Sequence, residues 1–117
     1  MESTRQHKIA RLIQKDLGLI FQQYGRDHFP GTMITVTKVY ITRDLSVAKI
    51  YLSLFTPASK PELLGKIRQH VKELRHHLGE RIKHQVRFVP ELLLFEDDSL
   101  DYIDNIDHLL HDDPGSK

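Results

Sequence analysis

The stretch from residue 63 to residue 84, LLGKIRQHVKELRHHLGERIKH, constrains the fold more than any other part of the sequence. Its hydrophobic residues recur at helical spacing and fall within about a third of the helical circumference, which is the pattern of one buried face. Basic residues and histidines occupy both flanks of that face. We therefore expect one continuous helix that buries an apolar stripe against the rest of the chain. The stripe consists of Leu63, Leu64, Ile67, Val71, Leu74, Leu78 and Ile82.

The sequence on either side predicts the elements that this stripe covers. Residues 5–24 repeat apolar side chains at helical spacing and are expected to form an amphipathic helix. β-Branched residues and alternation predict an antiparallel hairpin from Met33–Thr42 and Val47–Phe55, and Val86–Phe95 is expected to form a third strand. Apolar residues from Tyr102 to Leu110 predict a short final helix. The sequence thus predicts an α+β fold with a three-stranded sheet packed on helices.

Turn and cap residues mark where the helices end. Ser3 or Thr4 can cap the start of the first helix, and Gly25 is a natural stop. Ser59 or Lys60 lies near the cap of the long helix, and the following proline is acceptable in its first turn.

Three signals concern the strands. The alternation of the first strand changes phase near Thr37-Lys38, which predicts a β-bulge. Asp44 and Ser46 suit the hairpin turn because their side chains bond nearby backbone amides. Pro90 cannot donate to a ladder, which places it at a sheet edge, at a bulge or at the start of a strand.

Charge is divided unevenly along the 117 residues. Residues 1–90 hold 16 Lys and Arg against 7 Asp and Glu, whereas residues 91–117 hold one Lys against nine acidic residues. A basic body is typical of proteins that bind a polyanion, most often nucleic acid, although a solvated helical surface gives the same pattern. The acidic end either keeps the protein soluble or competes with nucleic acid for the basic surface. We expect one domain over residues 1–110 and a disordered acidic tail over residues 111–117.

Several classes of protein are not expected. The sequence has neither the run of about 20 apolar residues that a membrane span needs nor the apolar middle of a signal peptide, so a cytoplasmic protein is predicted. It has no cysteine, no glycine-rich phosphate loop, no HExxH and no nucleophile elbow, so neither an enzyme nor a cofactor is expected. His70, His77 and His84 invite a metal hypothesis, but their seven-residue spacing sets them about 10 Å apart along a helix. We expect these histidines to titrate near neutrality instead of binding a metal.

Two sets of motifs resemble the ribosome-binding factor A family. The segment Val39–Ser53, VYITRDLSVAKIYLS, resembles that family's V-x-x-[ST]-x-D-L-x-x-A-x-V-[YF]-[VL]-[ST] pattern. Leu74–Gly79 resembles its [IL]-R-x-x-L-[GA] motif, and Val89–Ser99 resembles its P-E-L and D-x-S motifs. The resemblance extends from about Arg5 to Leu110, nearly the whole sequence.

The resemblance implies a type II KH-like fold, α-β-β-α-β with a short C-terminal helix. Members of the family are small cytoplasmic proteins that bind the immature 30S ribosomal subunit and its 16S rRNA. They assist late subunit maturation and rRNA processing, leave before translation, and have no catalytic activity. We accordingly expect a monomer with the small subunit as partner and no membrane or small-molecule substrate. The alternative is a protein-interaction or homodimerising α+β module with no RNA role.

One departure from the family pattern concerns the long helix. The family carries a small-residue step, Ala-x-Gly, where the KH fold has its Gly-x-x-Gly loop, whereas the corresponding residues here are His70, Val71 and Lys72. Because none of these is small, we expect a straight or gently bent helix. Lys72, Arg75 and His70 are then expected to contact phosphates directly.

RNA binding of this kind depends on phosphate neutralisation by Lys and Arg. Tyr40, Tyr51 and Phe55 are weaker candidates for base stacking. The candidate RNA-binding residues are Lys66, Arg68, Lys72, Arg75, Arg81, Lys83 and Arg87, with Lys8, Arg11 and Lys15 as a second surface.

Overall fold

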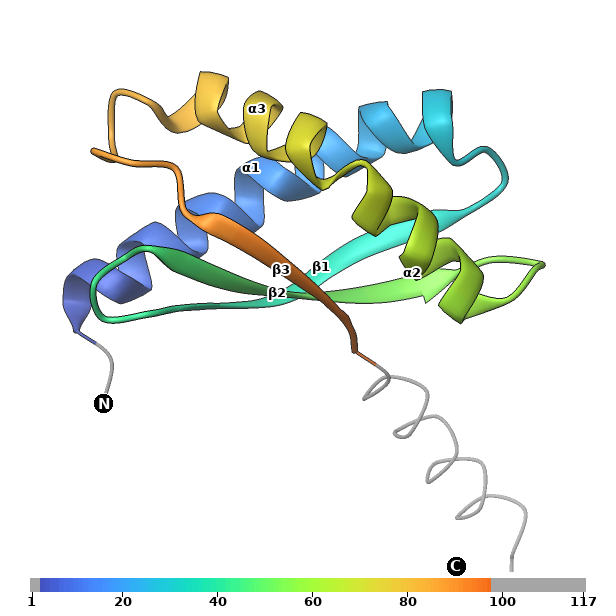
Figure 1. Cartoon of the computed structure of the whole chain (residues 1–117), viewed down its shortest axis with the longest axis horizontal. Helices are drawn as coiled ribbons and strands as arrows, with labels where there is room; N and C mark the ends of the chain where they lie inside the picture. Colours follow the sequence, from blue (N-terminus) through green and yellow to red (C-terminus); the bar gives the residue numbers. More distant parts are fainter. Residues whose placement is uncertain (1–2, 98–117) are drawn as a thin grey trace, which may run out of the picture.

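The computed structural model describes residues 3–97, which form a three-stranded sheet with three helices on one of its faces (Figure 1). The predicted α+β class is therefore confirmed. The predicted helix from Tyr102 to Leu110 and the predicted tail over residues 111–117 lie outside the described residues. In chain order the elements are α1 (Thr4–His28), β1 (Met33–Ile41), β2 (Val47–Phe55), α2 (Lys60–Gln69), α3 (Val71–Ile82) and β3 (Glu91–Glu96).

The sheet has β2 at its centre, paired antiparallel with β1 and parallel with β3. A parallel pair needs a long crossover, which α2 and α3 provide. The register shifts between Val36 and Lys38, so the predicted bulge is confirmed. Asp44 closes the hairpin turn, because its Oδ1 accepts hydrogen bonds from the Ser46 amide at 3.1 Å and the Thr42 hydroxyl at 2.8 Å. The hydrogen bonds from Ser46 and Thr42 hold the pKa of the Asp44 carboxyl below its usual value.

The core lies between the sheet and the helices. Alternation along β2 directs Ala48, Ile50 and Leu52 toward the helices, and all three are fully buried. α1 contributes Ile13 and Leu17 to the same core, also without exposure. Truncating one such leucine or isoleucine to alanine typically costs about 2–5 kcal/mol. The predicted apolar stripe is buried at Leu63, Leu64, Ile67, Leu74, Leu78 and Ile82, and half-buried at Val71.

The first helix is longer than predicted. Ser3 caps it as one of the two expected residues, in a capping box with Gln6. The expected stop at Gly25 is wrong, because α1 continues to His28. Buried Phe29 sets the end instead, with its amide donating to the Gly25 carbonyl at 2.8 Å.

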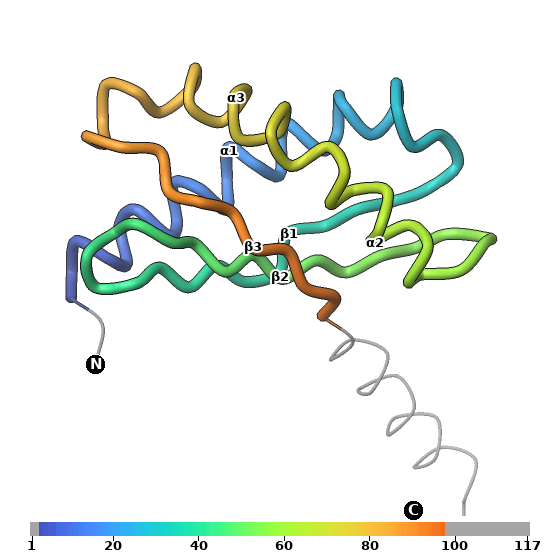
Figure 2. The backbone as a smooth tube through the Cα atoms, in the orientation of Figure 1, coloured from blue at the N-terminus to red at the C-terminus, as the bar shows by residue number. Residues whose placement is uncertain are grey.

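The long helix predicted over residues 63–84 is also wrong, because the chain breaks between α2 and α3 at His70 (Figure 2). His70 has φ −97° and ψ 9°, and its amide bonds the Ile67 carbonyl three residues back at 2.9 Å. Its imidazole packs edge-on against the Phe29 and Tyr24 rings, with centroids 5.1 and 5.5 Å away. These ring contacts hold the break, while Ile67 and Leu74 stay buried on either side of it.

The third strand is shorter than the predicted Val86–Phe95. β3 begins at Glu91, directly after Pro90. Of the three positions predicted for Pro90, the structure therefore shows the one at the start of a strand. Residues 83–90 form an irregular connection instead, and Arg75 holds its end by donating hydrogen bonds to the carbonyls of Val89 at 2.6 Å and Pro90 at 2.9 Å.

Candidate nucleic-acid interface

A groove of about 660 Å³ runs between α3 and the connection that follows it. In Figure 1 this connection turns back beside the end of α3 and leads into β3. The groove brings together four of the ten predicted RNA-binding residues, Lys72, Arg75, Lys83 and Arg87. We call this surface the basic groove. It is lined by Lys72, Arg75, His76, Gly79, Glu80, Lys83, Arg87, Phe88 and Val89.

One arginine and one glycine determine how closely the connection approaches α3. The Arg75 guanidinium donates to the carbonyls of Val89 and Pro90, which ties the connection to the middle of the helix. Gly79 allows the approach, because a Cβ at this position would lie only 3.0 Å from Cγ2 of Val89. The groove therefore depends on one arginine and one glycine of the motif-like segment Leu74–Gly79.

The charge of the basic groove is predominantly positive. Lys72, Lys83 and Arg87 are exposed, and the Arg75 guanidinium stands at the wall with its N–H groups bound to the connection. The one carboxylate is that of Glu80, which accepts a hydrogen bond from Lys83 Nζ at 3.4 Å. Four cations against one carboxylate give a surface complementary to phosphate groups.

Besides Glu80, the groove contains two residues that the sequence did not single out, Phe88 and His76. Phe88 is 72% exposed, and an aromatic ring beside cations is suited to stacking on a base. The sequence placed Phe88 within the predicted strand Val86–Phe95, so its exposure in an irregular connection was not foreseen. The weaker stacking candidates Tyr40, Tyr51 and Phe55 lie on the sheet, outside the groove.

The structure places the other predicted cations elsewhere. Arg68 donates to the Leu94 carbonyl at 3.1 and 2.6 Å, which fixes α2 to β3. Arg81 pairs with buried Asp16 of α1 at 3.2 Å. Lys66 is exposed on α2, outside the residues that line the groove. Lys8, Arg11 and Lys15 are exposed on α1 and also lie outside it.

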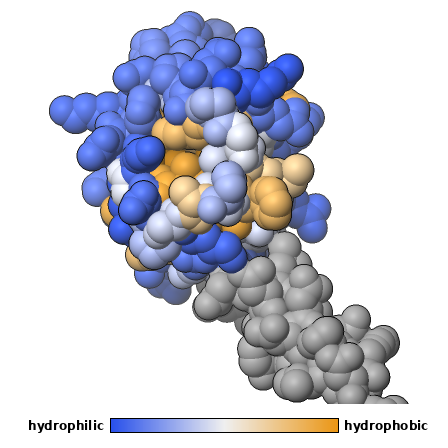
Figure 3. All heavy atoms as spheres, turned by 90° about the vertical axis from the view of Figure 1, so that its right-hand side faces the viewer, coloured by the Kyte–Doolittle hydropathy of each residue, from blue (hydrophilic) through white to orange (hydrophobic). Residues whose placement is uncertain are grey.

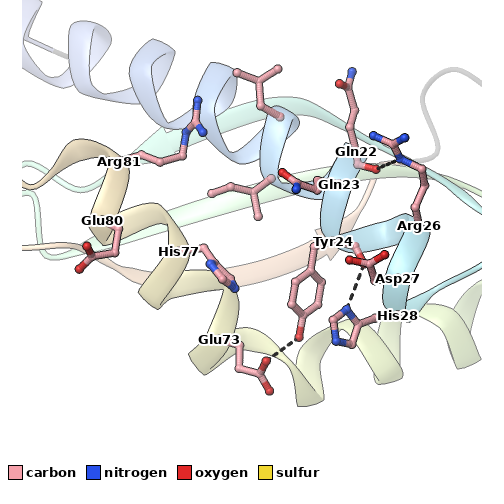
Figure 4. A pocket seen from close by; sticks show the side chains of 12 residues that line it. Gln22, Gln23, Tyr24, Arg26, Asp27, His28, Glu73, His77, Glu80 and Arg81 are labelled. Carbon is pink, nitrogen blue, oxygen red and sulfur yellow. Dashed lines mark hydrogen bonds between the residues drawn. The ribbon is translucent and has the colours of Figure 1, made fainter.

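A second hollow, of about 770 Å³, lies between the C-terminal half of α1 and α3 (Figure 4). The Tyr24 hydroxyl donates to Oε2 of Glu73 at 2.9 Å and also bonds Nδ1 of His70. Burial, and then the hydrogen bond and charge of Glu73, raise the pKa of Tyr24 to about 12. The ring of His28 stacks on that of Tyr24, with centroids 3.8 Å apart. His70, expected to contact phosphate, is thus packed among rings, a role that only the tertiary fold reveals.

Within residues 3–97, no group of three or more His, Asp or Glu side chains could hold a metal ion. Within the same range, none of the helices is long and apolar enough to span a membrane.

Comparisons with known proteins identify relatives of the chain. The family model described as ribosome-binding factor A matches residues 5–110. The ribosome-binding factor A of Cytophaga hutchinsonii is 46% identical over 110 residues, which cover 94% of this chain and 83% of that protein. The crystal structure of ribosome-binding factor A from Thermus thermophilus is similar with a TM-score of 0.64 and 18% identity, covering 78% of this chain and 94% of the other. A homology model of the Thermus thermophilus factor, fitted into a cryo-EM map of a complex with the 30S subunit, gives a TM-score of 0.60 and 20% identity, covering 74% and 89%.

Proposed function

Because the chain belongs to the ribosome-binding factor A family, we propose that it binds the small ribosomal subunit through the basic groove. The observation that carries this proposal is the gathering of Lys72, Arg75, Lys83 and Arg87 around one groove. The Thermus thermophilus factor fitted into the map of a complex with the 30S subunit supports the choice of partner.

The remaining parts of the proposal also rest on membership of the ribosome-binding factor A family. The chain is proposed to bind the immature 30S subunit and its 16S rRNA as a monomer, to assist late maturation and rRNA processing, and to leave before translation. It acts in the cytoplasm by binding alone, without catalysis. Residues 1–110 are proposed to form one domain of the type II KH-like fold. The observed order α-β-β-α-α-β supports that assignment over residues 3–97.

The break at His70 has a counterpart in the family pattern. It occurs where the family carries its small-residue step, although His70, Val71 and Lys72 are all larger than glycine or alanine. The ring contacts of His70 with Tyr24 and Phe29 supply the bend that small residues supply elsewhere. The bend makes α3 a separate helix, and Lys72 stands in its first turn at the edge of the groove.

The physical basis of binding is counterion release. Each Lys or Arg that neutralises a phosphate releases condensed cations, so affinity falls as salt rises. The cations of the groove are carried by a helix and by a connection that is bonded to it. Binding therefore costs less conformational entropy than it would if a flexible segment carried the same cations. Exposed Phe88 adds a surface on which an unpaired base can stack.

The test compares reversed charges on two surfaces. The double variant Lys72→Glu/Lys83→Glu should weaken binding to purified immature small subunits by at least about tenfold at 0.1 M salt. It should also reduce the slope of log affinity against log salt by about 2. The matched control, Lys8→Glu/Lys15→Glu, makes the same charge change on α1 and should have a much smaller effect. Mature subunits and an unrelated structured RNA measure specificity.

Two results would count against the proposal. An equal loss in both double variants would mean that net charge, and not the groove, determines binding. Equal and weak binding of the unmodified chain to every RNA would mean that the fold is retained without the function. In that case a stable oligomer, measured by sedimentation, would favour the protein-interaction alternative.

A further inference from the structure

The face of the sheet opposite the helices carries exposed hydrophobic side chains. Met33 is 65% exposed, Phe55 69%, Tyr40 47% and Leu93 36%. Single exposed hydrophobic residues are ordinary on protein surfaces, but a contiguous set marks an interaction site. We call this set, completed by Tyr51 and Phe95, the open-face strip.

The strip consists of a pair at one end of the sheet and a cluster of rings further along it. Met33 and Phe55 are directly paired across β1 and β2, and this end of the sheet shows exposed hydrophobic surface in Figure 3. Tyr51 stacks on Phe95 with ring centroids 5.4 Å apart. Tyr40 packs edge-on against Tyr51 at 5.7 Å. The strip therefore crosses all three strands.

The charged residues among the rings of the strip are basic, whereas Glu91 lies beyond Leu93 on the same face and Asp97 accepts a hydrogen bond from the Thr37 hydroxyl next to Lys38. Lys38 is paired with Tyr51 and Lys49 with Tyr40, which places both lysines on the same face as the rings, and both are exposed. A ligand that fits this face combines apolar side chains with negative charge.

The chain contains such a ligand in residues 98–110. Its hydrophobic residues include Ile103, Ile106 and Leu110, at helical spacing, and aspartates recur every three residues at 98, 101, 104 and 107. A helix this short is marginal in water unless its apolar side packs against a surface. The match to the family model also extends to residue 110.

The segment begins beside the strip. The Asp97 amide donates to the Leu52 carbonyl at 2.7 Å, which extends the parallel pairing of β3 with β2 by one residue. The chain is therefore directed along β2 toward Phe55, which lies about 10 Å further on at the rise of a β-strand. Twenty residues follow Asp97 in the sequence, enough to cross the sheet.

We propose that residues 98–110 bind back onto the open face of the sheet in the same molecule. Their apolar residues contact Met33, Phe55 and the Tyr51–Phe95 stack, and their aspartates lie near Lys38 and Lys49. This contact covers a surface that would otherwise promote association. It also keeps the acidic segment on the side of the sheet opposite the helices and the basic groove.

The experiment uses the full chain, in which methionine is rare and cysteine is absent. The sequence has two methionines, Met1 and Met33, and no cysteine, so a ¹³C-methyl methionine spectrum contains one signal from the strip, and one introduced thiol carries a unique nitroxide. A nitroxide on His108→Cys should abolish the Met33 methyl signal. Adding Ile106→Asp should restore it, whereas the matched control Asn105→Asp, which adds the same charge at the neighbouring position, should not.

The remaining outcomes overturn the proposal. A Met33 signal unaffected by the nitroxide means that the segment does not reach the strip. Quenching of ¹³C-labelled, nitroxide-free protein on mixing with nitroxide-labelled protein, or quenching that fades on dilution, identifies a second copy as the occupant. Broadening of the Lys72 and Lys83 amides instead means that the segment covers the basic groove.

Discussion

Tyr24 connects three parts of the molecule through a single hydroxyl group. It extends from α1, donates to Glu73 of α3, and bonds His70 at the junction of α2 and α3. The phenylalanine variant Tyr24→Phe keeps the ring packing and removes both hydrogen bonds. We expect a loss of about 1 kcal/mol in the free energy of unfolding, measured with urea near neutral pH.

The pH dependence of this effect has a definite sign. Burial and Glu73 raise the pKa of Tyr24 from 10.0 to about 12 in the folded protein. A raised pKa means that folding favours the neutral phenol, so its contribution is complete below pH 10 and disappears as pH rises toward 12. The stability difference between the unmodified chain and Tyr24→Phe should therefore shrink over this window. A constant difference from about pH 8 to pH 12 would contradict the assignment. The difference in tyrosinate absorbance between the unmodified chain and Tyr24→Phe reports the titration of Tyr24 itself.

The arginines show what the sequence cannot reveal at the level of single residues. Periodicity placed Arg68 and Arg75 on one flank of a helix, and Arg81 was a further candidate for RNA contact, but the sequence could not distinguish a free guanidinium from one bound to the protein. In the structure Arg68 and Arg75 donate to backbone carbonyls, and Arg81 pairs with Asp16. Each partner is at least 14 residues away in sequence, so only the fold brings them together.

At the level of elements, Gly79 provides a test of how the groove is built. Gly79→Ala adds a Cβ that would lie 3.0 Å from Cγ2 of Val89, whose carbonyl is held by Arg75. The matched control is Gly18→Ala within α1, where nothing lies within 4 Å of the added Cβ. Gly18→Ala should raise the free energy of unfolding by about 0.5–1 kcal/mol, because alanine is the better helix former.

Gly79→Ala should be less stable than Gly18→Ala by about 1 kcal/mol, because Val89 or the connection must move. It should also weaken RNA binding, since that movement changes the groove, whereas Gly18→Ala should bind normally. Urea unfolding and subunit binding measure the two effects. Equal stabilisation by both alanines would show that the connection adapts without cost.

The order and faces of the elements were predictable, whereas their ends depended on distant residues. Alternation in β2 and the stripe of residues 63–84 correctly indicated which side chains are buried. The break at His70 was missed because Ile67 and Leu74 remain seven residues apart on the same buried side, so the apolar pattern continues through it. α1 passes Gly25 because Phe29 is buried at its end. These ends are fixed by tertiary ring contacts, and local composition does not encode them.

At the level of the whole molecule, the distribution of charge has a testable consequence. The described part presents its basic groove on the helical side of the sheet, and residues 98–117 contain six aspartates and one lysine. If the acidic segment lies on the open face, a helical layer and the sheet separate it from the groove by about 20 Å. That distance exceeds the Debye length of about 10 Å at 0.1 M salt, but not the roughly 30 Å at 0.01 M.

The prediction concerns a variant in which Asp98, Asp101, Asp104 and Asp107 are replaced with asparagine. Its RNA affinity should differ from that of the unmodified chain by less than about twofold at 0.1 M salt and should be clearly higher at 0.01 M salt. The difference arises because only the longer Debye length lets these charges act on RNA in the groove. The matched control replaces the same four residues with glutamate, which keeps the charge and should leave affinity unchanged at both salt concentrations. Filter binding to one structured RNA measures both variants. An increase of about tenfold or more for the asparagine variant at 0.1 M salt would place the acidic segment at the groove as a competitor of RNA, the alternative that the sequence had left open.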